Sequence, residues 1–143
     1  MTLYLDASSL VKLYVEEPGA QVVRRAVRAA SIVATCAIAY AEARAAFAQR
    51  RRERILSAVG FKTVKRDLDD DWPSYLVLEP TMAICRLAGV LAERYRLRGY
   101  DSVHLAAFLE VARQAGDGKT QFSSFDDRLN RAARAARRAK LHS

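Results

Sequence analysis

A chain of 143 residues, of which 51% are hydrophobic, is long enough to bury one core, so we expect a single domain over residues 1–143. The sequence has no apolar run long enough to span a membrane, and it does not start with a basic stretch followed by an apolar one, as a signal peptide would. We therefore expect a cytoplasmic protein that does not bind membranes. Lysine and arginine outnumber aspartate and glutamate by 24 to 16, and the net charge of +8 favours a polyanionic partner, although solvated helix faces explain the arginine clusters equally well.

The first half of the chain alternates short apolar runs with amphipathic segments. The expected elements are, in chain order, a strand over residues 3–5, a helix over 10–14, a helix over 20–30, a strand over 31–35 and a helix over 37–49. Pro18-Gly19 marks the turn between the first two helices. An order that mixes strands and helices in this way is typical of α/β proteins.

The second half continues the alternation after a strongly charged segment. Residues 50–72 are predicted to form one or two exposed helices that end before Pro73. The elements expected next are a strand over 75–78, a helix over 81–96, a buried helix over 102–115, a strand over 121–125 and a basic helix over 126–138. Gly99 is interpreted as a break between two helices. The whole pattern predicts an α/β sandwich with a mostly parallel sheet.

Three aspartates stand at junctions that lead into helices. Asp6 follows the first strand, Asp101 precedes the most apolar helix, and Asp126 follows the last strand. In open α/β sheets, functional groups gather beyond the carboxyl ends of the strands. Asp6 and Asp101 are also consistent with helix caps, and Asp126 with a first-turn acid favoured by the helix dipole. Capping does not exclude a role in a site. The shared position of the three acids favours one common site.

Glu42 is one of two charged side chains within residues 36–48, the other being an arginine. Ile38 and Ala45 share its helical face, so we expect the carboxylate to be turned partly toward protein. A surface glutamate in a good helix former is the alternative. His104 lies in an almost wholly apolar helix and is interpreted as a buried histidine of the core or beside the site, not as a general base.

Carboxylates that lie together repel one another and need a counter-charge. A hard divalent cation such as Mg²⁺ or Mn²⁺ takes oxygen ligands and supplies that charge. Such a site suits the hydrolysis of a phosphodiester, because the cation polarises the phosphoryl oxygen and activates a water.

Four motifs occur in order along nearly the whole chain. They are Leu5-Asp6-Ala7-Ser8-Ser9-Leu10-Val11-Lys12-Leu13-Tyr14 with Glu16-Glu17-Pro18-Gly19, then Ala41-Glu42, then Asp101-Ser102-Val103-His104-Leu105-Ala106-Ala107, then Ser124-Phe125-Asp126-Asp127-Arg128-Leu129. Taken together, they resemble the motifs of PIN-domain proteins, and most of all those of VapC-type toxins from bacterial toxin–antitoxin pairs. The resemblance implies a three-layer α/β/α sandwich with a short, mostly parallel sheet of four to five strands.

The resemblance also implies an activity, a metal-dependent endoribonuclease that hydrolyses single-stranded or loop regions of RNA. The catalytic acids that it implies are Asp6, Glu42, Asp101 and Asp126. Among them, Asp6, Asp101 and Asp126 would bind Mg²⁺ or Mn²⁺, with Glu42 as a further ligand or as a base. Ser8 and Ser124 stand where the family has supporting hydroxyl groups.

Two features of the last quarter of the chain depart from the family pattern. The pair Asp126-Asp127 leaves open which carboxylate faces the metal, although the register with Phe125 and Leu129 favours Asp126. Residues 138–143 lack a clear apolar strand, so we expect the edge strand there to be weak or absent.

The resemblance further implies two protein partners. One is an antitoxin whose C-terminal segment covers the site and places a basic side chain against the acids. The other is a second copy of the chain, in a homodimer formed through apolar helices of the N-terminal half and through residues 81–97.

Two other functions are consistent with parts of the sequence. A phosphatase of the haloacid-dehalogenase type would use Asp6 as a nucleophile, but it requires a second aspartate two positions later, where this chain has Ser8. A non-catalytic basic RNA-binding module with a PIN-like fold would use the acids only as helix caps. In that case, replacing Asp6 or Asp101 by asparagine would leave RNA binding and cell growth unchanged.

Overall fold

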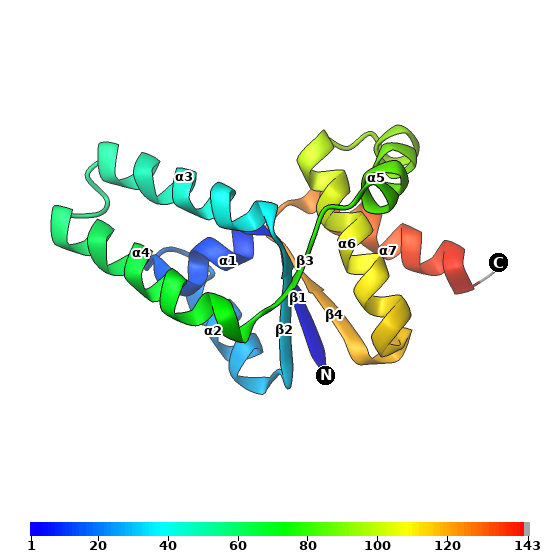
Figure 1. Ribbon diagram of the computed structural model, residues 1–143, viewed down its shortest axis with the longest axis horizontal. Coiled ribbons are helices and arrows are strands. Elements are labelled where there is room, and N and C mark those ends of the chain that lie inside the picture. The colour runs from blue at the N-terminus through cyan, green and yellow to red at the C-terminus, as the bar shows by residue number, and fades with distance from the viewer. Residues whose placement is uncertain (142–143) are drawn as a thin grey trace.

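The computed structural model describes residues 1–141, which fold into three layers with a sheet in the middle (Figure 1). The strands are β1 (Thr2–Leu5), β2 (Ile32–Cys36), β3 (Leu76–Leu78) and β4 (Thr120–Ser123). Their order is β3-β2-β1-β4 and every pair is parallel. The predicted α/β/α sandwich with a short parallel sheet is confirmed.

One helical layer is formed by the first half of the chain (Figure 1). Its helices are α1 (Ala7–Tyr14), α2 (Ala20–Ala29), α3 (Ile38–Arg52) and α4 (Ala58–Asp71). Leu3 and Leu5 of β1 lie in the same buried cluster as Phe47 of α3 and Leu68 of α4. Alternate residues of a strand share a face, so this pattern assigns one face of β1 to this layer.

The second helical layer covers the other face of the sheet (Figure 1). It consists of α5 (Met82–Tyr95), α6 (Gly99–Ala115) and α7 (Asp127–Leu141). Tyr4, which stands between the two leucines of β1, packs against Phe108 of α6 and Phe122 of β4. Helix α6 is buried on most of its surface, as its apolar sequence predicts.

Helix α6 begins at Gly99, three residues before its predicted start, and Arg98 is its N-cap residue. Gly99 therefore does not interrupt a helix but begins one. A glycine is tolerated in a first helical turn, where the backbone N–H groups have no partner within the helix. The reversal between α5 and α6 occurs instead at Arg96, which adopts a left-handed conformation with φ of 56°.

Strand β4 also differs from its prediction, because it ends at Ser123 and not at Phe125. Its partner β1 ends at Leu5, which pairs with Ser123, so the paired residues of the two strands end together. Phe125 lies in the loop that follows and is exposed.

Two further segments refine the predicted pattern. The charged segment holds the last residues of α3, the helix α4 and then a 3₁₀ turn, η1 (Trp72–Ser74). Helix α4 is not wholly exposed, because it buries Val64 and Leu68. A second 3₁₀ turn, η2 (Asp117–Lys119), precedes β4. Residues 138–141 belong to α7, so the described part of the chain adds no fifth strand, and residues 142–143 lie outside it. Within residues 1–141, no helix has the length and apolar character needed to cross a bilayer.

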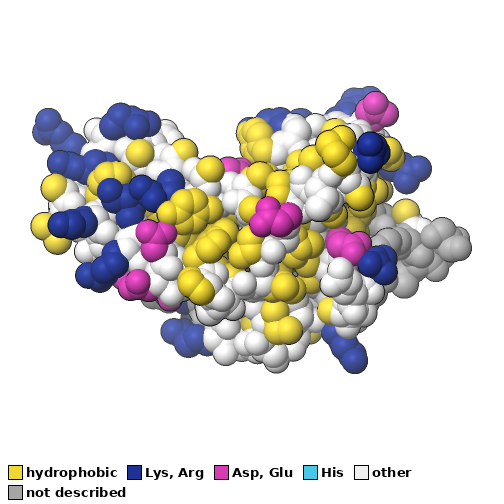
Figure 2. Space-filling model, in the orientation of Figure 1, with side chains coloured by type: hydrophobic (Ala, Val, Ile, Leu, Met, Phe, Trp, Pro, Cys, Tyr) yellow, Lys and Arg dark blue, Asp and Glu magenta, His cyan; other side chains and the backbone are white. Residues whose placement is uncertain are grey.

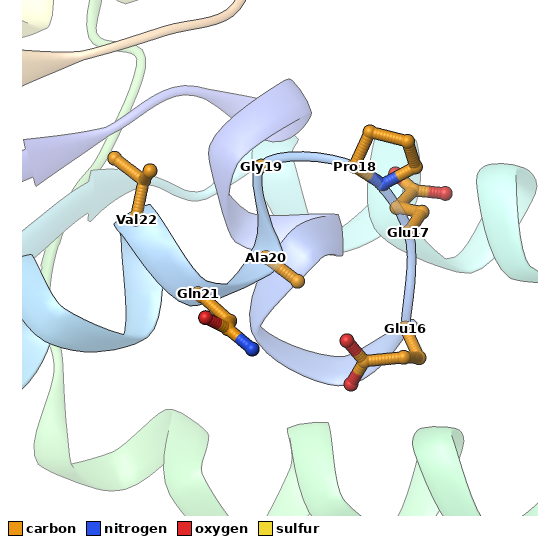
Figure 3. A pocket seen from close by; sticks show the side chains of 7 residues that line it. All are labelled: Glu16, Glu17, Pro18, Gly19, Ala20, Gln21 and Val22. Carbon is orange, nitrogen blue, oxygen red and sulfur yellow. The ribbon is translucent and has the colours of Figure 1, made fainter.

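A pocket lined by residues 16–22 lies at the turn between α1 and α2 (Figure 3). Glu17 fixes this turn through ion pairs with Lys12 at 3.0 Å and with Arg50 of α3 at 2.9 Å. Burial alone would raise the pKa of Glu17, but the hydrogen bonds from these two cations outweigh it and lower the pKa below its ordinary value. The turn is therefore tied to the first helical layer and is not a loose loop.

Gly19 is required at this turn for two reasons. Its φ of 93° is strained for any residue with a side chain, and a Cβ atom there would lie 2.6 Å from the Phe125 ring. We expect Gly19→Ala to lower the free energy of unfolding by roughly 1–3 kcal/mol in urea denaturation. The matched control is Gly118→Ala, because nothing lies within 4 Å of a Cβ at that position, and its change should stay within about 0.5 kcal/mol. Equal changes in the two variants would contradict the strain assigned to Gly19.

Candidate active site

The loops that follow β1 and β4 meet at one edge of the sheet. The backbone N–H of Asp6 donates to the carbonyl oxygen of Ser123 at 3.2 Å, which continues the ladder one residue past the strands. Because the two strands are parallel, their carboxyl ends lie at the same edge. Asp6 is therefore brought beside residues 124–126, more than a hundred positions away in the sequence.

Asp6 is only 4% exposed, and its carboxylate accepts three hydrogen bonds. Oδ1 accepts from the backbone N–H of Ser9 at 3.0 Å and from the hydroxyl of Ser8 at 2.7 Å. Oδ2 accepts from the hydroxyl of Ser124 at 2.6 Å. The bond from Ser9 makes Asp6 the N-cap of α1, so the capping role that the sequence allowed is present. The other two bonds come from the serines that the sequence proposed as supporting residues.

The same two hydroxyl groups also fix the loop after β4. Ser8 Oγ accepts from the backbone N–H of Phe125 at 3.0 Å, and Ser124 Oγ accepts from the backbone N–H of Asp126 at 3.0 Å. Asp126 in turn accepts the N–H of Leu129 at 3.0 Å and so caps α7. Each serine therefore links the loop after β1, which carries Asp6, to the loop after β4, which carries Asp126.

Arg98 connects the remaining aspartates. Its Nε donates to Asp101 Oδ2 at 3.0 Å, and its Nη2 donates to Asp126 Oδ2 at 3.3 Å. Asp127, by contrast, is exposed at the start of α7. Asp126 is thus the member of the acidic pair that faces Asp101. Asp101 stands in the first turn of α6 and caps nothing, because the N-cap residue is Arg98 and makes no side-chain cap bond.

The three aspartates are close enough to influence one another. Burial raises the pKa of Asp101, and the negative charges of Asp126 and Asp6 add to that rise, although Arg98 opposes it. The pKa of Asp101 is therefore raised even beside an arginine. Such an arrangement favours a site that takes up additional positive charge.

Glu42 lies on α3, and its side chain is 27% exposed. Its Oε1 lies 2.7 Å from Nε2 of His104, and Nδ1 of the same ring lies 2.8 Å from the hydroxyl of Tyr4. Burial raises the pKa of Tyr4 well above its ordinary value, so the phenol keeps its proton. The His104 ring thus bridges the Tyr4 hydroxyl and the Glu42 carboxylate, one through each ring nitrogen.

The predictions for these two residues are confirmed in geometry. Glu42 is partly turned toward protein, and His104 is buried, with 1% of its surface exposed. The structure brings Asp6, Asp101 and Asp126 together around Arg98 and Ser124, whereas Glu42 is paired with His104. In the part of the chain that the structure describes, no group of three or more His, Cys, Asp or Glu side chains is arranged so that it could hold a metal ion as it stands.

Two residues of this site are not predicted from the sequence. Arg98 gives a signal only if a helix begins at Gly99, because its spacing of three from Asp101 then indicates an ion pair. Tyr4 gave no signal, because an apolar strand residue does not reveal the direction of its hydroxyl group.

The chemistry of the donors fits a hard divalent cation. The four acids and the two serines offer only oxygen atoms, which Mg²⁺ and Mn²⁺ prefer as ligands. A positive group, the guanidinium of Arg98, already lies between two of the carboxylates. The residues present therefore suit the metal that the sequence predicts.

The surface around the site carries opposite charges. The molecule is hollowed between the α3–α4 lobe and the α5–α6 lobe, and acidic side chains reach the surface in that hollow (Figure 2). Lysine and arginine side chains crowd the far end of the α3–α4 lobe (Figure 2). Arg51, Arg52 and Arg54 are exposed there. A polyanion could thus be held by the basic lobe while it reaches the acids.

A parallel α/β/α sandwich with clustered aspartates at its carboxyl edge defines a class of small proteins suited to metal and phosphate chemistry. The family model described as "PIN domain" matches residues 3–135. The chain therefore belongs to the PIN-domain family.

Curated relatives agree with this assignment. Ribonuclease VapC45 of Mycobacterium tuberculosis (strain CDC 1551 / Oshkosh) and Ribonuclease VapC49 of Mycobacterium tuberculosis (strain ATCC 25618 / H37Rv) are each 34% identical to this chain over 134 residues. The matched region covers 94% of this chain and 90% of each relative. The prediction of a VapC-type PIN domain is confirmed.

Proposed function

We propose that this chain is a divalent-metal-dependent endoribonuclease that cuts single-stranded or loop regions of RNA and serves as the toxin of a type II toxin–antitoxin pair. The observation that carries the proposal is the meeting of Asp6, Asp101 and Asp126 at one edge, joined through Arg98 and Ser124. The similarity to two proteins named ribonuclease VapC, over nearly the full length, supports the choice of RNA as substrate.

Asp6, Asp101 and Asp126 would hold Mg²⁺ or Mn²⁺, which when bound supplies Lewis acidity toward the phosphoryl oxygen and an activated water. Three hydrogen bonds prevent the Asp6 carboxylate from rotating, so its oxygens are positioned before any ligand arrives. Glu42, oriented by His104, would be a further ligand or the base that accepts a proton from the attacking water.

The basic lobe would bind the backbone of the RNA. Exposed arginines at 51, 52 and 54 can neutralise phosphates, a contact that carries no sequence information and weakens with salt. Unpaired loops are the expected targets, because the deep groove of duplex RNA is closed to side chains.

Two protein partners complete the proposal. An antitoxin segment with a basic side chain would cover the acidic edge and block access of RNA. A second copy of the chain would pack against α5, where Met82, Leu87 and Val90 are exposed apolar side chains. A cytoplasmic location belongs to the same proposal, because there a toxin of this kind would meet its RNA substrate and its antitoxin.

The test is incubation of the purified chain with total RNA, with Mg²⁺ or Mn²⁺ and with a chelator, followed by mapping of new RNA ends. We expect cuts that require the metal and that disappear in Asp126→Asn. Asp127→Asn removes the same charge one residue away, at an exposed position, and should cut like the wild type. Cleavage that persists in the chelator, or equally in both variants, would contradict the assignment.

The rival interpretation as a non-catalytic RNA-binding module accounts for only part of the geometry. Asp6 and Asp126 do accept backbone N–H bonds as helix caps, but Asp101 and Glu42 cap no helix. The phosphatase alternative has no second aspartate at position 8, where the Ser8 hydroxyl instead donates to Asp6. Of the three interpretations, the nuclease assignment gives a role to all four acids.

A further inference from the structure

Arg98 is placed unlike any other arginine of the described chain, because it lies between two carboxylates of the candidate active site. It uses separate nitrogens for the two contacts, with Nε 3.0 Å from Asp101 and Nη2 3.3 Å from Asp126. One guanidinium thus contacts both Asp101, in the first turn of α6, and Asp126, just before α7, and offsets one of their two negative charges. Those same oxygens are the ones a divalent cation would need, and two cations cannot share them without repulsion.

The ion pairs of Arg98 are easily broken. Its side chain is 62% exposed, and exposed pairs of this kind contribute little to stability. Its backbone stays anchored independently, because its carbonyl oxygen accepts the N–H of Ser102 at 2.9 Å. The guanidinium also lies 4.7 Å from the ring of the exposed Tyr100, which offers a surface along which it can move. The side chain can therefore leave the acids without unfolding α6.

We propose that Arg98 is a displaceable counter-ion, which offsets part of the negative charge of Asp101 and Asp126 while no divalent cation is bound and turns to an RNA phosphate once a cation replaces it. The inference rests on the proposed function and assigns a role in it to a residue outside the four acids. A guanidinium is suited to both states, because its fork of donors matches a carboxylate and a phosphate equally well. Arg98 would thus link metal binding to substrate binding.

The proposal predicts effects of opposite sign in Arg98→Gln. Without the competing cation, the protein should bind Mn²⁺ about three- to tenfold more tightly in titration calorimetry at low salt. At saturating Mn²⁺, the same variant should cleave RNA less well, because a phosphate contact is lost. The matched control is Arg94→Gln, which removes an exposed arginine of α5 for which the described residues show no ion pair, and it should change neither quantity.

Circular dichroism and thermal melting would verify that Arg98→Gln is folded, as expected for an exposed side chain. A variant that binds Mn²⁺ no more tightly than the wild type would overturn the inference, and so would one that cleaves RNA as fast as the wild type. If the wild type cuts RNA with Mn²⁺ in these cases, the proposed function stands without the role of Arg98. A wild type that binds no Mn²⁺ would overturn both.

Discussion

Asp6→Asn is expected to lower RNA cleavage by about a thousandfold or more, equivalent to about 4 kcal/mol of transition-state stabilisation, because it removes a fixed negative oxygen from the metal site. The fold should survive. The amide oxygen can still accept from Ser8 and from the N–H of Ser9, and the hydroxyl of Ser124 can turn to accept from the new amide group. We expect a loss of about 1 kcal/mol in the free energy of unfolding.

The measurement is the rate of cleavage of a defined RNA at saturating Mn²⁺, together with a urea denaturation curve for each protein. Asp70→Asn provides the control, because it makes the same charge change on the exposed surface of α4. It should retain full activity. An Asp6→Asn protein that is folded and cleaves within tenfold of the wild type would refute the assignment of Asp6 as a catalytic acid.

His104→Leu is expected to have two separable effects, because the ring connects the buried hydroxyl of Tyr4 to Glu42. The leucine leaves that hydroxyl without a partner in the core, which should cost about 1–3 kcal/mol of stability. It also frees the Glu42 carboxylate from its fixed orientation, which should lower cleavage by roughly 10- to 100-fold.

A double-mutant cycle with Tyr4→Phe separates these effects. In the His104→Leu background, Tyr4→Phe removes the unpaired hydroxyl, so it should restore part of the lost stability but none of the lost activity. In the wild-type background, Tyr4→Phe keeps the bond between His104 and Glu42 and should leave activity within a few-fold of normal. Cleavage rates that simply follow the stabilities of the four proteins would show that His104 does not position Glu42.

Much of the fold could be predicted because the pattern of apolar residues is local information. The apolar run from Leu3 to Leu5 and the nearly all-apolar surface of α6 each specify an element and its burial. The ends of elements were predicted less well. Strand β4 stops where its neighbour β1 stops, and α6 starts three residues early. Both ends depend on partners that are distant in sequence.

The candidate site could likewise be predicted only in part. The acids Asp6, Asp101 and Asp126 could be named from their positions before helices, and Ser8 and Ser124 from the family resemblance. Their arrangement could not be predicted. The sequence did not show that Ser8 and Ser124 each bond to Asp6 and to the loop after β4, or that Glu42 pairs with His104.

The sequence by itself determined the identity of the elements, the family motifs and the residue types that can carry metal chemistry, because these depend on neighbours along the chain. Only the tertiary structure decided which carboxylates meet. Parallel pairing of β1 with β4 places residues 6 and 126 at one edge, and the start of α6 at Gly99 directs Arg98 between Asp101 and Asp126. The physical reason is that hydrogen-bonded strand register and helix burial fix distances between residues that have no local relation in the sequence.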